Sequence, residues 1–419
     1  MRYPSIRVAI LASLAYLGIW IGSSLVQTWA DLSGDAALVS ALSSREWTVL
    51  LPGLGFIGLM IMGMAQQFVP LYSGRELWNP RAALVQVSWA AAGVLLLLLG
   101  PSFELFGLGL WFAATVLFLF LILMTLRTQP LPVRPQGKRP EFMRMDRYGI
   151  PMTSAAVLYL IVASAGLFLA SPSAAPVVPF AAENWFSFFH LYTLGFVTLM
   201  IFGVGFHLFP RFLDTPPRLA LAKAILVLAL PGPALVALTM PFLGDPAAGF
   251  VFALFAAVEA TAAVLFAILV LDVWWRSERR RPSSAFNAVA GLWLVLGVGL
   301  ATLFGIDPVH FLAWAPAHGW VNLLGFAGFE ILGVTHEILP PFTSKGLRVS
   351  RGVTRADLVL AVVGLGLVVS SYDAKLQGST SLGDTMALAG FAILLVMVLL
   401  YACGTVWALF GIVRPKRVK

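Results

Sequence analysis

Cysteine is almost absent from this chain of 419 residues, because Cys403 is the only one. A single cysteine excludes disulfides within the chain, Cys-ligated zinc sites and Cys-ligated iron–sulfur centres. Charge is also scarce: Asp, Glu, Lys and Arg make up 11% of the residues, while hydrophobic residues make up 60%. This composition argues against a soluble globular domain and is typical of an integral membrane protein.

The net charge of +8 does not indicate a nucleic-acid partner. Lys and Arg concentrate in short segments between apolar runs, as the topology signals of membrane proteins do. The expected surroundings are therefore a lipid bilayer, with no nucleic acid.

Apolar runs long enough to cross a bilayer fill most of the sequence. A spanning helix needs about 20 mostly apolar residues, and on this rule we predict an all-α integral membrane protein with twelve transmembrane helices. The predicted spans are residues 6–30, 47–70, 83–101, 103–125, 150–170, 185–209, 219–243, 247–275, 286–306, 316–340, 355–372 and 384–413.

Basic residues mark one side of the predicted bilayer. Alternate connections hold clusters of Lys and Arg, whereas the other connections hold only Arg45 and Lys375. The positive-inside rule then places the basic side and both termini in the cytoplasm, and the protein in the cell inner (plasma) membrane as a multi-pass protein. The longest basic connection, residues 127–149, is predicted to be a cytoplasmic linker loop.

A glycine-proline frame occurs three times. Each copy has a Gly-Phe pair, a glycine eight positions after the first glycine, and a proline seven positions after that. The copies are Gly55-Phe56, Gly63 and Pro70; Gly195-Phe196, Gly203 and Pro210; and Gly325-Phe326, Gly333 and Pro340. This agreement predicts internal repeats over residues 1–126, 150–276 and 284–414, that is, three pseudo-symmetric groups of four helices within a single polytopic domain. Close helix packing or the approach of a flat cofactor would each explain the glycines.

Histidine is rare and unevenly placed. The chain has five: His190, His207, His310, His318 and His336. At ~1.5 Å per residue, His190 and His207 lie roughly 25 Å apart on one frame helix, and His318 and His336 roughly 27 Å apart on another.

Each of these two helices thus has one histidine near each surface. Imidazole is a ligand of haem iron and of copper, so we predict His190 and His318 as metal ligands. His207 and His336 are predicted as a second cofactor-binding pair, and an unbroken α-helix places His318 and His336 on one face. His310 is predicted to be an interfacial residue in the loop 307–316.

Carboxyl groups at membrane depth are costly and usually mark function. Glu330 and Glu337 lie on the tenth predicted span. They predict a proton path from the cytoplasm; the alternative for Glu330 is one protonated carboxyl bonded to a neighbouring helix. The candidates for hydrogen bonds to the ligating imidazoles are Tyr192, Thr193, Thr198, Asn322 and Thr335, although bonding within its own helix is the expected role of each threonine.

Twelve spans in three groups of four, with histidines on spans six and ten, resemble subunit I of the haem-copper oxidase superfamily. The H…GF…G…H…P frame is also similar to the NnrS family, haem- and copper-containing membrane proteins linked to nitric oxide metabolism. The resemblance implies a haem, taken as b-type, with copper as an option. It also implies that His190 matches the metal ligand of span six and His318 a haem ligand of span ten.

Two departures limit what this resemblance implies. The oxidase pattern has a haem histidine on span two, but residues 47–70 contain none. It also has a His-His copper pair near span seven, which residues 219–243 lack. A binuclear oxygen-reducing centre is therefore not expected.

We expect instead a divergent relative with one haem or metal between spans six and ten. It would act in respiratory redox chemistry or in binding nitric oxide or oxygen, alone or with a redox partner or other membrane subunits. Whether it is an enzyme stays open. The alternatives are a secondary transporter and a non-catalytic subunit of a membrane complex.

Overall fold

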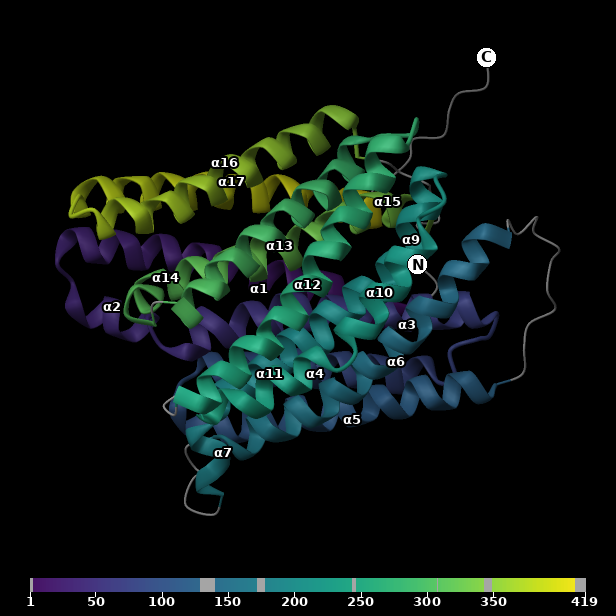
Figure 1. Cartoon of the computed structure of the whole chain (residues 1–419), viewed down its shortest axis with the longest axis horizontal. Coiled ribbons are helices and arrows are strands. Elements are labelled where there is room, and N and C mark those ends of the chain that lie inside the picture. Colours follow the sequence, from purple (N-terminus) through teal and green to yellow (C-terminus); the bar gives the residue numbers. More distant parts are fainter. Residues whose placement is uncertain are drawn as a thin grey trace.

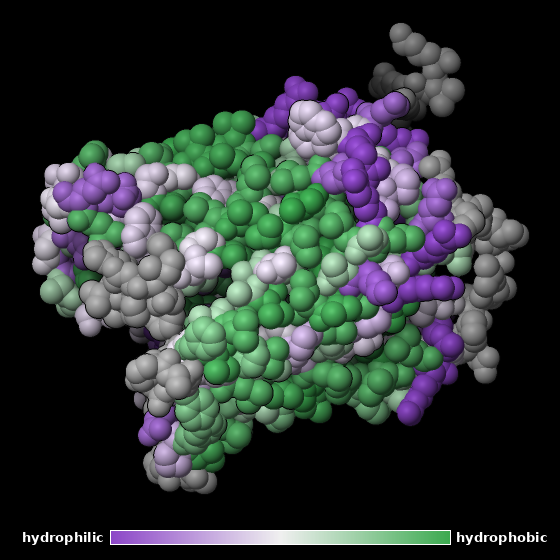
Figure 2. Space-filling view, viewed as in Figure 1, coloured by the Kyte–Doolittle hydropathy of each residue, from purple (hydrophilic) through white to green (hydrophobic). Residues whose placement is uncertain are grey.

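The computed structural model describes residues 3–128, 140–171, 178–242, 246–306, 308–342 and 349–410. These residues are almost entirely helical and contain no strand. Eleven helical stretches among them are long and apolar enough to cross a membrane. The predicted span 316–340 is not one of the eleven, but it lies within an uninterrupted run of helix from Pro308 to Phe342. Figure 2 shows an apolar band between two polar ends, which agrees with the all-α membrane fold predicted from the sequence.

The helices follow the predicted order of spans. The first group comprises α1 (Pro4–Ser33), α2 (Ala36–Leu42), η1 (Glu46–Gly58), α3 (Leu59–Ser73), α4 (Pro80–Leu98), η2 (Pro101–Phe103) and α5 (Glu104–Arg127). The second comprises α6 (Pro140–Leu169), α7 (Pro179–Glu183), α8 (Trp185–His190), η3 (Leu191–Thr198), α9 (Leu199–Leu213), α10 (Leu219–Ala229), α11 (Gly232–Thr239), η4 (Met240–Phe242) and α12 (Pro246–Arg276). The third comprises α13 (Pro282–Ile306), α14 (Pro308–Trp320), η5 (Val321–Gly328), α15 (Phe329–Phe342), α16 (Arg351–Leu376) and α17 (Thr380–Phe410).

Local sequence signals set many of these ends. Proline stands at the first position of several helices, where its missing N–H costs no hydrogen bond. The side chain of Asn79 accepts hydrogen bonds from the first turn of α4, and that of Ser350 accepts one from α16. Gly34 and Gly74 have positive φ and end α1 and α3, a conformation that glycine adopts without strain.

The long helices run roughly along the longest axis of the molecule (Figure 1). The outer helices pack in a closed series, in the order α1, α4, α5, α6, α10, α12, α13, α16 and α17, and α17 packs against α1. The two frame-bearing spans Ala36–Leu71 and Trp185–Leu213 are 83% and 78% buried, whereas the other nine are only 33–44% buried. The frame-bearing helices therefore occupy the centre, and their neighbours separate them from lipid.

Each frame-bearing helix has a π-helical segment at the same place. The segments η1, η3 and η5 end at Gly58, Thr198 and Gly328, and each contains the Gly-Phe pair of the frame. π-Helices are rare and concentrate at functional sites. Because their i→i+5 bonds wind more residues into a turn, the single-face geometry computed for His318 and His336 on an unbroken α-helix is wrong. The repeat boundaries themselves stay a prediction.

The frame glycines pack helix against helix. A Cβ on Gly195 would lie 2.6 Å from the Tyr159 ring of α6, and one on Gly325 would lie 2.8 Å from the Trp293 ring of α13. A Cβ on Gly203 would lie 2.6 Å from Thr153. Each glycine thus permits contact with the first helix of its own group, so close packing accounts for them without a cofactor.

Two predicted loops are partly helical. α6 begins at Pro140, inside the predicted linker 127–149. The predicted loop 307–316 belongs largely to α14. The side chain of His310 lies outside the described residues.

Candidate functional site

The strongest candidate for a metal centre is formed by His190 and His318. His190 is the last residue of α8 and His318 lies near the end of α14, so each precedes a π-helical segment. The Nδ1 atom of His190 lies 3.0 Å from the carbonyl oxygen of Phe186, and that of His318 lies 3.1 Å from the carbonyl oxygen of Gly297. Because a carbonyl oxygen only accepts, Nδ1 of His190 donates its proton and Nε2 of that ring keeps its lone pair. Nδ1 of His318 lies between the Gly297 carbonyl oxygen and the Asn322 amide nitrogen, and it donates to the former in the same tautomer as His190. Metal-ligating imidazoles in proteins are held in this way.

His190 and His318 lie on two different frame helices, within range of an electrostatic interaction with each other. Asn322 donates a hydrogen bond of 2.8 Å to the carbonyl oxygen of His318, and its amide lies 3.2 Å from Nδ1 of that ring. Asn322 therefore orients His318 from one turn further along the same helix.

The other polar residues predicted around the imidazoles bond elsewhere. Thr193 and Thr335 donate to carbonyl oxygens of their own helices, and Thr198 donates to Thr193. The Tyr192 hydroxyl donates to the carbonyl oxygen of Gly53 at 2.9 Å and so ties η3 to η1. Of the predicted set, Asn322 is the residue that contacts an imidazole, that of His318.

The donor set at this place is two imidazoles. The described residues contain no group of three or more His, Cys, Asp or Glu side chains that could hold a metal ion. Two imidazoles are a donor set that would hold the iron of a haem or a copper ion. The residues present therefore fit one haem or one copper.

The interior beside α1 has aromatic rings in place of imidazoles. Trp20 of α1 stacks on Trp320 of α14, with ring centroids 4.1 Å apart and planes 3° apart. Phe391 of α17 lies against Trp320 at 5.0 Å. These side chains fill this part of the bundle, which agrees with the missing histidine on the first frame helix.

The inner histidines, His207 and His336, have aspartate partners on other helices. His207 Nδ1 lies 2.7 Å from an oxygen of Asp146 on α6, which Arg211 contacts through both carboxylate oxygens. His336 Nε2 lies 3.3 Å from an oxygen of Asp357 on α16. Each inner histidine thus faces an aspartate from another helix, and this contact competes with metal binding.

Sequence reasoning missed both aspartates. Asp146 and Asp357 each lie near the basic end of a helix, where an acidic residue resembles an ordinary part of a loop. Asp357 is nevertheless fully buried. A lone acidic residue just inside an apolar run was the one signal available in the sequence.

Glu330 and Glu337 lie along a polar seam between α13 and α15. Ser283 and Arg281 donate to Glu337, the arginine at 2.9 Å. One turn further along α13, Asn287 donates to Glu330, which is 2% exposed. Both carboxyl groups thus lie on the face of α15 that packs against α13. We call this set of five residues the α13–α15 seam: Arg281, Ser283, Asn287, Glu330 and Glu337.

No family model matches this chain, and no curated protein sequence matches it. Among solved structures it is similar to a chain of a haem-copper terminal oxidase dimer determined by cryo-electron microscopy. The TM-score is 0.75 at 13% sequence identity, over 98% of this chain and 84% of the other. The chain therefore has the fold of a haem-copper terminal oxidase chain, as its resemblance to subunit I implied.

Proposed function

We propose that this chain is a membrane redox protein that holds one haem, of b-type, or one copper ion between His190 and His318. What supports the proposal is the pair itself: two imidazoles at corresponding positions on two frame helices, within range of an electrostatic interaction and each with Nδ1 beside a backbone carbonyl oxygen. The shared fold supports it, because the similar structure is described as a haem-copper terminal oxidase. When bound, the haem or copper would supply electron transfer and binding of nitric oxide or oxygen.

The chain's own residues would prepare the two ligands. Phe186 and Gly297 hold Nδ1–H of the two rings through their carbonyl oxygens, which fixes the tautomer. Asn322 restrains the His318 backbone and ring. The Nε2 lone pairs are thereby available at fixed orientations.

The remaining features of the proposal concern topology. The arginine-rich end faces the cytoplasm together with both termini, in the cell inner (plasma) membrane. The α13–α15 seam, from Glu337 inward to Glu330, is the path by which protons reach the interior from that side. Three repeats, over residues 1–126, 150–276 and 284–414, explain why the π-helical segments recur.

Reduced-minus-oxidised absorption spectra and metal analysis test the proposal. The purified wild type is compared with His190→Ala and His318→Ala, and His207→Ala is the matched control from the same helix as His190. We expect a haem band, or about one copper per chain, that both outer variants lose and the control retains. Full cofactor binding in both outer variants, or neither cofactor in the wild type, would refute it. A shift of the band with nitric oxide would identify that ligand.

A secondary transporter is the second candidate, and one observation favours it. The seventh span is broken between α10 and α11, and a Cβ on Gly232 at this break would lie only 1.9 Å from a carboxylate oxygen of Glu259. Glu259 is 6% exposed, and its carboxylate has no hydrogen bond among the described residues. Broken helices beside mid-membrane carboxylates form ion sites in transporters. If the purified protein holds neither haem nor copper, and its proteoliposomes show cation-driven uptake that the variant Glu259→Gln lacks, the transporter is favoured. If the protein shows neither cofactor binding nor uptake, a non-catalytic subunit is favoured.

A further inference from the structure

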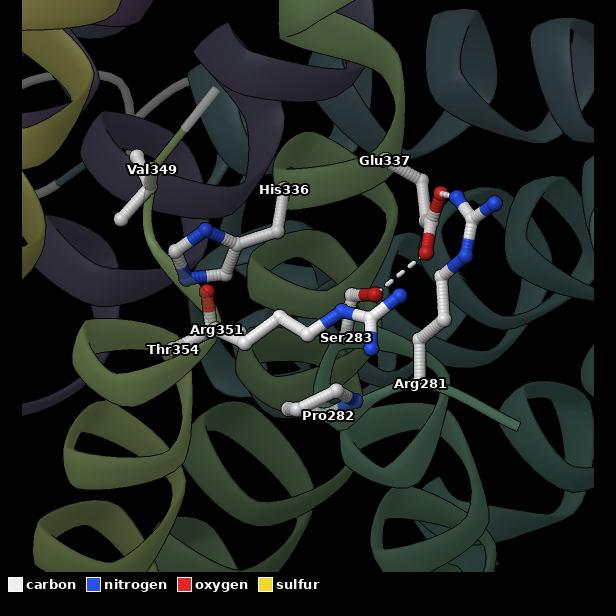
Figure 3. Close-up of a pocket in the computed structure, with 8 residues that line it drawn as sticks. All are labelled: Arg281, Pro282, Ser283, His336, Glu337, Val349, Arg351 and Thr354. Carbon is white, nitrogen blue, oxygen red and sulfur yellow. Dashed lines mark hydrogen bonds and ion pairs between the residues drawn. The ribbon is translucent and has the colours of Figure 1, made fainter. Parts of the chain in front are cut away.

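A small cavity opens at the arginine-rich end of the bundle, between α13, α15 and α16. Its volume is about 90 Å³, which is room for several water molecules or for one tetrahedral oxyanion. The residues around it are Arg281, Pro282, Ser283, His336, Glu337, Val349, Arg351 and Thr354. Figure 3 shows Arg351 extending across the cavity towards Ser283, with His336 on one side and the Arg281–Glu337 pair on the other.

Two long helices begin at this cavity. α13 begins at Pro282 and α16 at Arg351, and both residues line its wall. The first N–H groups of a helix have no partner within the helix, and its N-terminus has a partial positive charge. Two helix N-termini at one cavity therefore favour a bound anion.

The side chains add a positive excess. Arg281 is paired with Glu337 at 2.9 Å, whereas no ion pair is found for Arg351 among the described residues. A neighbouring hollow shares Arg281 and Arg351 with the cavity and is lined otherwise by Glu278, Arg279 and Arg280. The cavity is thus left with one uncompensated guanidinium next to further arginines.

A buried imidazole faces the same space. The His336 side chain is only 5% exposed, yet it lines the cavity. Its Nε2 atom has no hydrogen bond among the described residues, although Asp357 lies 3.3 Å away. Burial of an unsatisfied polar atom is costly, and an anion that accepts a hydrogen bond from the protonated ring would remove that cost.

We propose that this cavity binds a phosphate group, held mainly by Arg351 and by the first turns of α13 and α16. The pairing of Arg281 with Glu337 fixes one wall, and His336 is a further donor when protonated. Two sources share this chemistry: a soluble phosphate or phosphate ester, and the headgroup of an anionic phospholipid, because the cavity lies at the arginine-rich end of a bundle of membrane-spanning helices.

The test uses the full-length protein with two matched variants. Arg351→Gln removes the proposed contact, and Arg355→Gln removes an exposed arginine one turn along the same helix. In detergent, thermal unfolding is followed by tryptophan fluorescence in millimolar potassium phosphate against potassium chloride of equal ionic strength. In a second arm, each protein is purified from phosphatidylcholine nanodiscs with and without phosphatidic acid, and retained lipid is measured by mass spectrometry.

We expect one of two supporting results. A rise in the unfolding temperature with phosphate that Arg351→Gln loses and Arg355→Gln keeps would identify a soluble phosphate. Phosphatidic acid retained by the wild type and by Arg355→Gln, but not by Arg351→Gln, would identify a lipid headgroup. Removing one charged donor should weaken binding about tenfold or more. Equal behaviour of the wild type and Arg351→Gln in both arms would overturn the proposal.

Discussion

Removing Asp357 should be among the most damaging single changes outside the proposed metal centre. The Asp357 side chain is 1% exposed and the His336 side chain 5%, and the distance from Nε2 to Oδ2 is 3.3 Å. Asp357→Leu would leave a buried imidazole without this partner, and loss of one member of a buried pair costs about 3–5 kcal/mol. The ratio of unfolded to folded protein would rise by about a hundredfold or more.

The double variant His336→Leu/Asp357→Leu is the informative control. Since it leaves no buried charge, its free energy of unfolding should lie closer to that of the wild type than either single variant does. Unfolding in mixed micelles of detergent and sodium dodecyl sulfate gives the three free energies, and their double-mutant cycle gives the coupling. The reasoning would be refuted if Asp357→Leu lowered the free energy of unfolding by less than about 1 kcal/mol. It would also be refuted if the loss in the double variant equalled the sum of the losses in the two single variants.

Three further predictions concern packing, charge and the metal centre. Gly203→Leu should lower the free energy of unfolding by about 1–3 kcal/mol in the same assay, because a Cβ at this position would clash with Thr153 of α6. An unchanged free energy of unfolding would contradict the packing role of Gly203. Arg45→Ala should lower the free energy of unfolding by about 3–5 kcal/mol, since Arg45 donates to Glu104, which is 2% exposed. Adding Glu104→Gln to this variant should restore part of the lost free energy, and no recovery would argue against the stabilising role of the ion pair. Asn322→Leu should lower the affinity for the cofactor about ten- to hundredfold, because His318 would lose the side chain that orients it. The affinity is measured from the cofactor content of the protein during dilution. Retention of the cofactor at the wild-type level would count against the orienting role of Asn322.

The sequence was informative wherever a pattern repeats along one helix. Apolar length predicted the spans, and the glycine frame identified the three helices that occupy the centre. The positions of His190 and His318 on two of these helices also predict that their rings face a common interior, and this stays a prediction. That prediction required only that the repeats be arranged alike.

Contacts between neighbouring helices were beyond such patterns. His207 and His336 were predicted as one cofactor pair, but each faces an aspartate supplied by another helix. Which residues of α6 and α16 face inward depends on how these helices rotate in the bundle. The π-helical segments were likewise invisible, since hydrophobic periodicity averages over a single wide turn.

The wide turn between His190 and His207 gives one membrane span a tolerance in length. In an ordinary buried helix, deleting one residue rotates everything beyond it by about 100°. Deleting one residue from Leu191–Thr198 would instead let this stretch return to α-helical winding, because its i→i+5 turn already holds an extra residue. His190 would keep its contact with Phe186 and His207 its contact with Asp146, on either side of the deletion.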